Sequence, residues 1–337
     1  DAADRSAGAT FEMPLADVEK AAAILLGGSN PRLDQPLLGH RIRKAWKRGA
    51  MIDAVNPIDF DFHFETASAR IVEPWQMLDE VAAIAKAALE LSGGSVDMVV
   101  AKLIAESKVD DVHRAIAKRL LGASSSVLVF GDFAVQHPAA SRLRALARAV
   151  AQLTNTAFNE VASGANGVGL ARVGVVPGEG GASAAQILAQ PRKALLTWHA
   201  GSQDTLRSKA YDDARSNAEF HVYVGAYACN GVKRTAHAVL PIGLAPEIDG
   251  SYVNVDGSVQ IVAAGAKLPG EARAGWRVLR ALGAALGVSN FDFTDIADVR
   301  ARMGGKLGAA VPMSAAMSDT TKSGVGLTRI ATVPIYR

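Results

Sequence analysis

The segment Gly27-Gly28-Ser29-Asn30 has the composition and the position of a loop that could hold a phosphate group. It follows a short apolar run at residues 21–26 and precedes a helix that is expected to begin at Pro36. Backbone N–H groups between a strand and a helix can bind an anion. The spacing fits neither G-x-G-x-x-G nor a P-loop, and Asn56 stands where an acid often holds a ribose. We therefore expect a vestigial loop without a ligand, made of Gly27, Gly28, Ser29 and Asn30.

Three other side chains could act as a base or a nucleophile. His199 follows an apolar strand, His237 adjoins one, and Cys229 precedes a glycine. None lies in a recognisable nucleophile motif, and the sequence contains no G-x-S-x-G. The seven histidines show no i, i+4 pair, and a single cysteine can form neither an internal disulfide nor a cysteine-built zinc or iron–sulfur site. We expect no catalytic residue and no metal ligand in this chain.

A strongly basic run occupies residues 40–48. It has the composition of a nucleic-acid or membrane patch, but Leu38, Ile42 and Ala45 are spaced to face a sheet on one side of a helix. The basic side chains would then fan outward, as a solvated surface or as a contact to an acidic partner. The overall charge of only +3, from 36 basic and 33 acidic residues, also argues against nucleic acid.

The elements that would position these residues alternate between strands and helices. Helices are expected from Pro36, Pro74, Asp111, Pro138 and Ala272. The glycine-rich stretch 162–182 is predicted to be a long loop, and Asp256-Gly257 predicts a hairpin. Buried strands are expected at residues 21–26, 51–55, 126–130, 194–198, 220–224 and 236–240. Strand–helix–strand units build parallel sheets, so the pattern predicts an α/β fold.

Composition sets the limits of this interpretation. The chain has 337 residues, 49% of them hydrophobic and 20% charged, which is enough for about two globular domains. We expect a first lobe at residues 1–122, a second at 123–303 and a loosely ordered tail at 304–337. No apolar stretch is long enough to predict a transmembrane helix, and no signal peptide is visible.

Three segments resemble the large iron–sulfur subunit of bacterial NADH–quinone oxidoreductase, respiratory complex I. The first resembles the family's "GxNPR…P…RxRKAW…GA" stretch and covers Ile24 to Ala50. The second, Val239 to Gln260, looks like "VLP…E.DGTYVNTEGRVQ", although Val255 and Ser258 replace the expected Thr and Arg. The third, from Pro269 to Leu282, is similar to "PPGEAR.DW.ILRAL". Both ends fall within family segments, so we expect a piece of a longer subunit.

The resemblance implies an α/β fold with two parallel-sheet αβα, Rossmann-like lobes of the molybdopterin oxidoreductase type that has lost its cofactor. It implies no cofactor in this chain and iron–sulfur clusters in an N-terminal part that lies outside it. The implied role is a scaffold for electron transfer from NADH to quinone, peripheral on the cytoplasmic side of the bacterial inner membrane. The implied partners are other peripheral-arm subunits of complex I, with no nucleic acid and no membrane insertion.

Two alternatives stay open at this point. One is a fragment of a true molybdopterin-dependent oxidoreductase, in which the loop at residues 27–30 and the stretch 162–182 line a pterin-nucleotide site. The other is an independent NAD-dependent enzyme. Metal and pterin analysis separates the first alternative from the scaffold, and titration with NADH tests the second.

Overall fold

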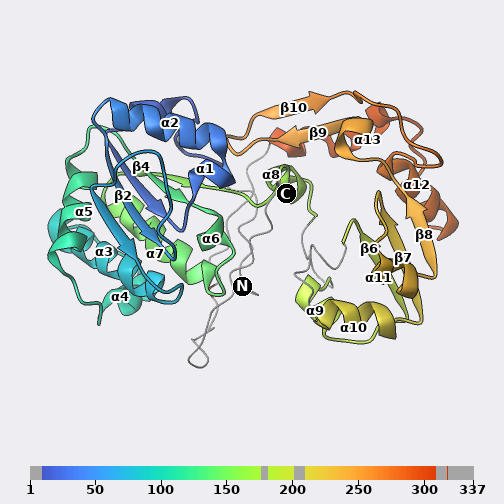
Figure 1. The fold of residues 1–337 in the computed structure, drawn as a ribbon, viewed down its shortest axis with the longest axis horizontal. Helices are drawn as coiled ribbons and strands as arrows, with labels where there is room; N and C mark the ends of the chain where they lie inside the picture. Colours follow the sequence, from blue (N-terminus) through green and yellow to red (C-terminus); the bar gives the residue numbers. More distant parts are fainter. Residues whose placement is uncertain (1–9, 176–180, 201–208, 309–316, 318–337) are drawn as a thin grey trace. The chain divides into compact units, whose positions relative to one another are not determined.

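The computed structural model describes residues 10–175, 181–200, 209–308 and 317. These residues form two compact units, each built on a parallel sheet (Figure 1). Among the described residues, unit 1 contains those up to Val168, the short segment Asn254–Ser258 and residue 317, and unit 2 contains Gly169–Val253 and residues 259–308. No helix in the described part of the chain is long and apolar enough to cross a membrane.

The sheet of unit 1 has five parallel strands in the order β3-β2-β1-β4-β5. Their bounds are β1 Ala23–Gly27, β2 Met51–Asn56, β3 Ser68–Ile71, β4 Ser126–Phe130 and β5 Ala157–Glu160. The central strands are largely apolar, as is typical of strands that are covered on both faces. The order reverses at β1, because the chain first builds toward β3 and then returns to add β4 on the other side.

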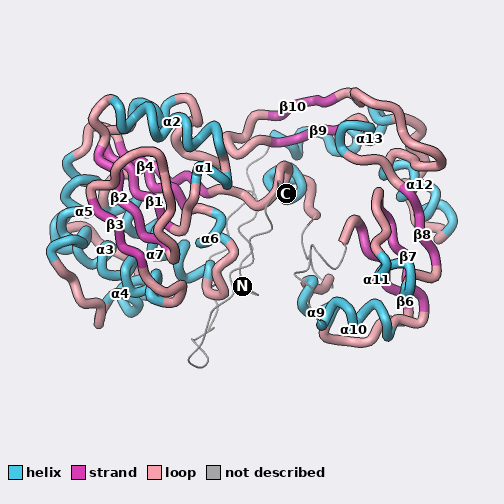
Figure 2. The backbone as a smooth tube through the Cα atoms, in the orientation of Figure 1, coloured by secondary structure: helices cyan, strands magenta, loops and turns pink. Residues whose placement is uncertain are grey.

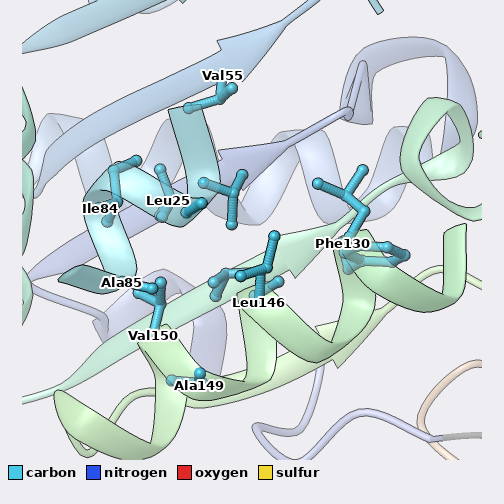
Figure 3. Close-up of a cluster of buried hydrophobic side chains, with 14 of the residues drawn as sticks. Leu25, Val55, Ile84, Ala85, Phe130, Leu146, Ala149 and Val150 are labelled. Carbon is cyan, nitrogen blue, oxygen red and sulfur yellow. The ribbon is translucent and has the colours of Figure 1, made fainter. Parts of the chain in front are cut away.

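Helices cover both faces of this sheet (Figure 2). The 3₁₀ helix η1 (Asp17–Lys20) and α2 (Pro36–Lys47) contribute to the core on one face, where Ile24 and Val127 lie. On the other face, Leu25 and Phe130 pack against α3 (Gln76–Ser92), α4 (Met98–Ile104), α5 (Asp111–Gly122) and α7 (Ala140–Leu153). Figure 3 shows this second core, with Leu25 and Phe130 of the strands beside Ile84 and Leu146 of the helices. Two short helices, α1 (Pro31–Asp34) and α6 (Asp132–Val135), follow β1 and β4.

Unit 2 has a sheet of three parallel strands, in the order β6 (Ala194–Trp198), β7 (Phe220–Gly225) and β8 (Ala238–Pro241). Its other elements are α8 (Gly167–Arg172), α9 (Ala184–Leu188), α10 (Lys209–Asn217), α11 (Asn230–Thr235), the 3₁₀ helix η2 (Ala245–Glu247), the hairpin strands β9 (Gly250–Val253) and β10 (Val259–Val262), α12 (Gly275–Ala285), α13 (Ile296–Met303) and the 3₁₀ helix η3 (Gly304–Gly308). The α/β class with parallel sheets is as predicted.

The expected lobe boundary after residue 122 is wrong. Strands β4 and β5 join the first sheet, where β4 pairs with β1 along its whole length from Ala23↔Ser126 to Gly27↔Phe130. The first unit therefore continues to Val168. The predicted loop at residues 162–182 contains α8, and residues 176–180 are not among the described ones. Of the expected tail, residues 304–308 form η3, and the rest, apart from residue 317, lies outside the described residues.

The hairpin at Asp256-Gly257 is confirmed, but its turn is longer than two residues. Val253 pairs with Val259, so Asn254–Ser258 forms the turn, closed by a hydrogen bond from Asn254 N to Ser258 O of 2.9 Å. Val255 lies in this turn and is buried in the same core as Ile24. Its backbone oxygen accepts a hydrogen bond of 2.9 Å from Phe11 N.

Candidate functional site

The loop after β1 lies where ligands bind in open α/β sheets. The strand order reverses at β1, with β2 on one side of it and β4 on the other. The carboxyl end of the strand at such a reversal is called the topological switch point. Gly28 has a φ of +59°, a left-handed conformation that favours glycine. A Cβ atom on Gly28 would lie 2.6 Å from Ala134 N. Gly28 is therefore required both by the conformation of the turn and by the approach of α6.

Asn56 fixes the loop from the neighbouring strand. Ser29 N donates to Asn56 Oδ1 at 2.8 Å, and Asn56 Nδ2 donates back to Ser29 O at 3.2 Å. Gly28 N donates to Val55 O at 2.9 Å. Ser29 and Asn56 are fully buried. In the sequence, Asn56 was noted only because it stands where an acid often holds a ribose. In the structure its side chain holds the loop backbone through two hydrogen bonds.

Helix α6 closes the loop from the other side. Gly131 N donates to Gly27 O at 2.9 Å, and Phe133 N donates to Gly28 O at 3.0 Å. A Cβ on Gly131 would lie only 2.3 Å from both Cα and Cβ of Ser29. Backbone therefore lies against backbone at this point, which only a glycine at position 131 allows.

Two further backbone N–H groups donate to the carboxyl group of Asp34. Asn30 N donates to Asp34 Oδ2 at 2.9 Å, and the backbone N–H of Asp132 also hydrogen-bonds to the Asp34 carboxyl group. Burial raises the pKa of Asp34 to about 6, and the nearby charge of Asp132 adds to this, although the two backbone hydrogen bonds act in the opposite direction. Asp132 itself accepts hydrogen bonds from Gln136 Nε2 at 2.7 Å and Ser163 Oγ at 3.3 Å.

These contacts test whether the loop fits the pyrophosphate of a pterin nucleotide, the group that would bind here in the molybdopterin-dependent alternative. A pyrophosphate needs several converging N–H groups. The amides of Gly28, Ser29 and Asn30 already have acceptors in the protein, and the carboxyl groups of Asp34 and Asp132 lie beside them. Two buried side-chain atoms of the loop have no protein partner, Asn30 Oδ1 and Ser29 Oγ. Asn30 Oδ1 is an acceptor and does not attract an anion, and the single hydroxyl of Ser29 does not replace the several converging N–H groups. The residues present do not fit the group.

The other residues considered from the sequence belong to unit 2. His199 follows β6 with a φ of +51°, and its backbone N donates to Val224 O at 2.7 Å. His237 Nδ1 accepts a hydrogen bond of 3.0 Å from His221 N, and Cys229 is exposed at the start of α11. Among the described residues, no three His, Cys, Asp or Glu side chains are placed to hold a metal ion.

One fully buried polar residue of unit 2, His221, was not singled out from the sequence. His221 is fully buried, and its Nε2 lies 3.0 Å from Thr197 Oγ1. Burial lowers the pKa of His221, with smaller contributions from Arg215 and His237. A regular strand pattern gives no signal for such a residue, because it shows only which side of the sheet a side chain faces.

The basic helix α2 uses several of its charges inside unit 1. Glu19 binds Arg41, Lys44 and Arg48, with Lys44 Nζ at 3.2 Å from Glu19 Oε2. The hydrogen bond from Arg41 is the largest cause of the drop in the Glu19 pKa to about 2. The apolar residues of α2 face the sheet as expected, because Leu38, Ile42 and Ala45 are buried.

A charged cluster at the end of β3 was also not predicted. Arg70 donates from Nε to Glu80 Oε2 at 2.6 Å and from Nη2 to Asp110 Oδ2 at 2.8 Å. His113 Nδ1 accepts from Asp110 N at 3.0 Å, which leaves Nε2 to donate to Glu80 at 2.9 Å. The cluster lines a surface cavity of about 870 Å³. Its charges pair with one another across β3, α3 and α5, so it joins these elements.

Three curated relatives have sequences similar to this chain. The chain is 28% identical over 294 residues to the 78 kDa subunit of mitochondrial NADH-ubiquinone oxidoreductase from Neurospora crassa, covering 87% of this chain and 34% of that protein. It is 27% identical to the corresponding 78 kDa subunit of Candida albicans, with 87% and 35% covered, and 24% identical to the NADH dehydrogenase iron-sulfur protein 1 of Solanum tuberosum, with 89% and 36% covered. The chain therefore spans about a third of the length of these curated relatives.

A solved structure shares the fold. Acetylene hydratase from Pelobacter acetylenicus superposes with a TM-score of 0.63 at 11% identity, over 91% of this chain and 52% of that one. The profile of the molybdopterin oxidoreductase family matches residues 2–285. The chain belongs to the molybdopterin oxidoreductase family.

Proposed function

We propose that this chain is a scaffold segment of the large iron–sulfur subunit of an NADH–quinone oxidoreductase, and that its own loop residues have replaced the cofactor. The observation that carries the proposal is the closed loop after β1. Asn56 and Asp34 take up the backbone amides of Ser29 and Asn30, and Gly131 lies against Ser29. The names of the curated relatives supply the assembly.

In this proposal the chemistry takes place outside the chain. Electrons pass from NADH to quinone through iron–sulfur clusters held by other parts of the same subunit and by other subunits. The single cysteine of this chain is exposed and cannot hold a cluster alone. What the chain contributes is a rigid α/β support in the peripheral arm, with the other peripheral-arm subunits as its partners.

The rival function is a molybdopterin-dependent oxidoreductase. It is less well supported, because binding the pterin nucleotide would require Asp34 to leave the amide of Asn30 and would place phosphates next to two carboxyl groups. An independent NAD-dependent enzyme meets the same obstacle at the same loop.

Purification of the complete subunit with an affinity tag, from detergent-solubilised membranes, tests the proposal. The expected eluate oxidises NADH with an artificial acceptor and contains non-haem iron but no stoichiometric molybdenum. An untagged strain treated identically is the control. An eluate with about one molybdenum per subunit and no NADH oxidation would assign the chain to the rival enzyme.

The loop itself gives a second test. We expect no binding of NADH, NADPH or guanine nucleotides tighter than about 1 mM, which corresponds to roughly −4 kcal/mol. Isothermal titration of the complete subunit with guanine nucleotide measures it. For NADH and NADPH, the comparison is between the wild type and Gly28→Val, because other sites of the subunit could bind them. A micromolar dissociation constant that disappears in Gly28→Val would contradict the scaffold proposal.

A further inference from the structure

One face of the three-stranded sheet of unit 2 is apolar and open. Parallel register pairs Leu196 with Val222 and Trp198 with Val224, and it pairs Val224 with Leu240. Residues paired in this way point to the same side of a sheet. The side chains on this side, here called the open face, carry no charge: Ala194, Leu196, Trp198, Phe220, Val222, Val224, Ala238 and Leu240. Leu196 is 42% exposed and Phe220 is 48% exposed.

The opposite face holds both crossover helices. Leu195, on that face, packs in a cluster with Ala214 of α10, and Thr235 of α11 lies 3.5 Å from the ring of His221. The topology explains this arrangement. The strands follow one another in a single direction, β6-β7-β8, and right-handed crossovers in one direction fall on one face.

The described residues cover part of the open face, because Val224 is fully buried and its neighbours Val222 and Leu240 are part-buried. The exposed part is formed by Ala194, Leu196, Trp198 and Phe220. A Cβ on Gly275, at the start of α12, would lie 2.6 Å from Trp198 Cζ2, so α12 begins beside this tryptophan. Trp198 nevertheless stays 36% exposed. Purely parallel sheets occur almost only with both faces covered by helices, because their crossovers supply the helical layers. Within the described ranges of the chain, the open face therefore has no helical layer of its own.

We propose that the open face binds a helix of the same subunit polypeptide, from the part that lies outside these 337 residues. Two observations favour this occupant. The curated relatives are about three times as long as the matched segment, so a long stretch of the same polypeptide is present in such a subunit. The face also carries no charge, which is typical of permanent interfaces and interiors, whereas transient contacts are more polar.

The inference rests on the proposal that the chain is part of a longer subunit, but it does not depend on electron transfer. Thiol labelling of the complete, isolated subunit tests it. In a Cys229→Ser background, and with any other reactive cysteines of the subunit blocked or replaced, Leu196→Cys places a thiol on the open face. Val239→Cys is the matched control, because Val239 is 43% exposed in the same sheet but points to the opposite face.

We expect a maleimide to label the thiol at position 196 at least ten times more slowly than the thiol at position 239, and equally fast after denaturation. Equal labelling rates in the native subunit would overturn the proposal. A photoreactive maleimide attached at position 196 then identifies the occupant by mass spectrometry. Cross-links to the same polypeptide outside residues 1–337 are expected, whereas cross-links only to another subunit or to a second copy would overturn the choice of occupant.

Both readouts are independent of NADH oxidation. A subunit that shows the expected protection but does not co-purify with NADH-oxidising activity would contradict the proposed function and leave this inference standing. A subunit that has this activity but is labelled as fast at position 196 as at position 239 would contradict this inference and leave the proposed function standing.

Discussion

The sheet of unit 1 reverses its strand order at β1, whereas the sheet of unit 2 proceeds from β6 to β8 without reversal. The reversal places crossovers on both faces, so Leu25 and Ile24 enter two different cores. Without a reversal, Leu195 is buried and its neighbour Leu196 is 42% exposed. Among the described residues, the same class of element thus gives a sheet with helices on both faces in unit 1 and a sheet with one partly exposed face in unit 2, and strand order makes the difference.

The largest expected effect compares two phenylalanines of these sheets. Phe130→Ala, in the core of unit 1, is expected to lower the unfolding free energy by about 3–5 kcal/mol, because a buried ring leaves a cavity. Phe220→Ala, on the open face, is expected to cost less than about 1 kcal/mol in this chain. Denaturant unfolding followed by circular dichroism measures both. Equal losses would mean that the two sheets are equally well covered.

The second prediction concerns the closure of the loop in unit 1. Gly131→Ala is expected to destabilise unit 1 by roughly 3 kcal/mol, because its Cβ would overlap Ser29 and the backbone must move. Gly122→Ala is the control, since Gly122 ends α5 and has no atom within 4 Å of an added Cβ. That control should be neutral or stabilising by up to about 1 kcal/mol. A tolerated Gly131→Ala would show that the loop is open.

The third prediction uses the pH dependence of the same loop. The pKa of Asp34 is raised to about 6 in the folded protein, from an ordinary value near 3.8. The unfolded chain therefore loses its proton first, and stability from this group falls as pH rises from about 4 to 6. The shift corresponds to about 2–3 kcal/mol.

Unfolding free energies at about pH 4 and about pH 7.5 should show this loss in the wild type but not in Asp34→Asn. Asp59→Asn, at an exposed position, is the control and should retain the wild-type pH dependence. If Asp34→Asn loses as much stability as the wild type over this range, the carboxyl group is not held in the loop as described.

The smallest expected effect is at the surface of unit 2. Cys229→Ser should change the unfolding free energy by less than about 0.5 kcal/mol, because Cys229 is exposed at the start of α11. Thermal unfolding measures this. A loss above about 2 kcal/mol would show that unit 2 depends on this thiol and would rule out the cysteine-free background for labelling.

Much of the secondary structure of unit 1 could be predicted because each of these elements carries its own signal in the sequence. The apolar strand before Gly27, the helix from Pro36 and the strand before Asn56 all lie where periodicity and proline placed them. Strands β3 (Ser68–Ile71) and β5 (Ala157–Glu160) were not predicted, because each has four residues and contains a charged one. The strand at residues 126–130 was predicted but assigned to the second lobe, because the sequence does not show that it pairs with β1.

The expectations for unit 2 failed in a different way. Leu279 and Leu286 have the spacing of one apolar face in the helix expected from Ala272, yet they are 40% and 70% exposed. An apolar spacing shows which face of an element is suited to packing, but it does not show whether a partner is present in the same chain. The loop at residues 27–30 was expected to be vestigial, yet the residues that close it, Asp34 and Gly131, come from other elements and gave no local signal.

Val255 has a consequence for how the protein is made. The five strands of the unit 1 sheet and the helices that cover it all lie before Val168, but the core of this unit also includes the Val255 side chain from the hairpin turn. A ribosome adds about 5–20 residues per second, so the nascent sheet waits on the order of ten seconds for this side chain. During that interval the surface around Ile24 and Phe11 lacks its cover. Chaperone contacts during translation are therefore expected to centre on this side of unit 1 and to end once the hairpin has emerged.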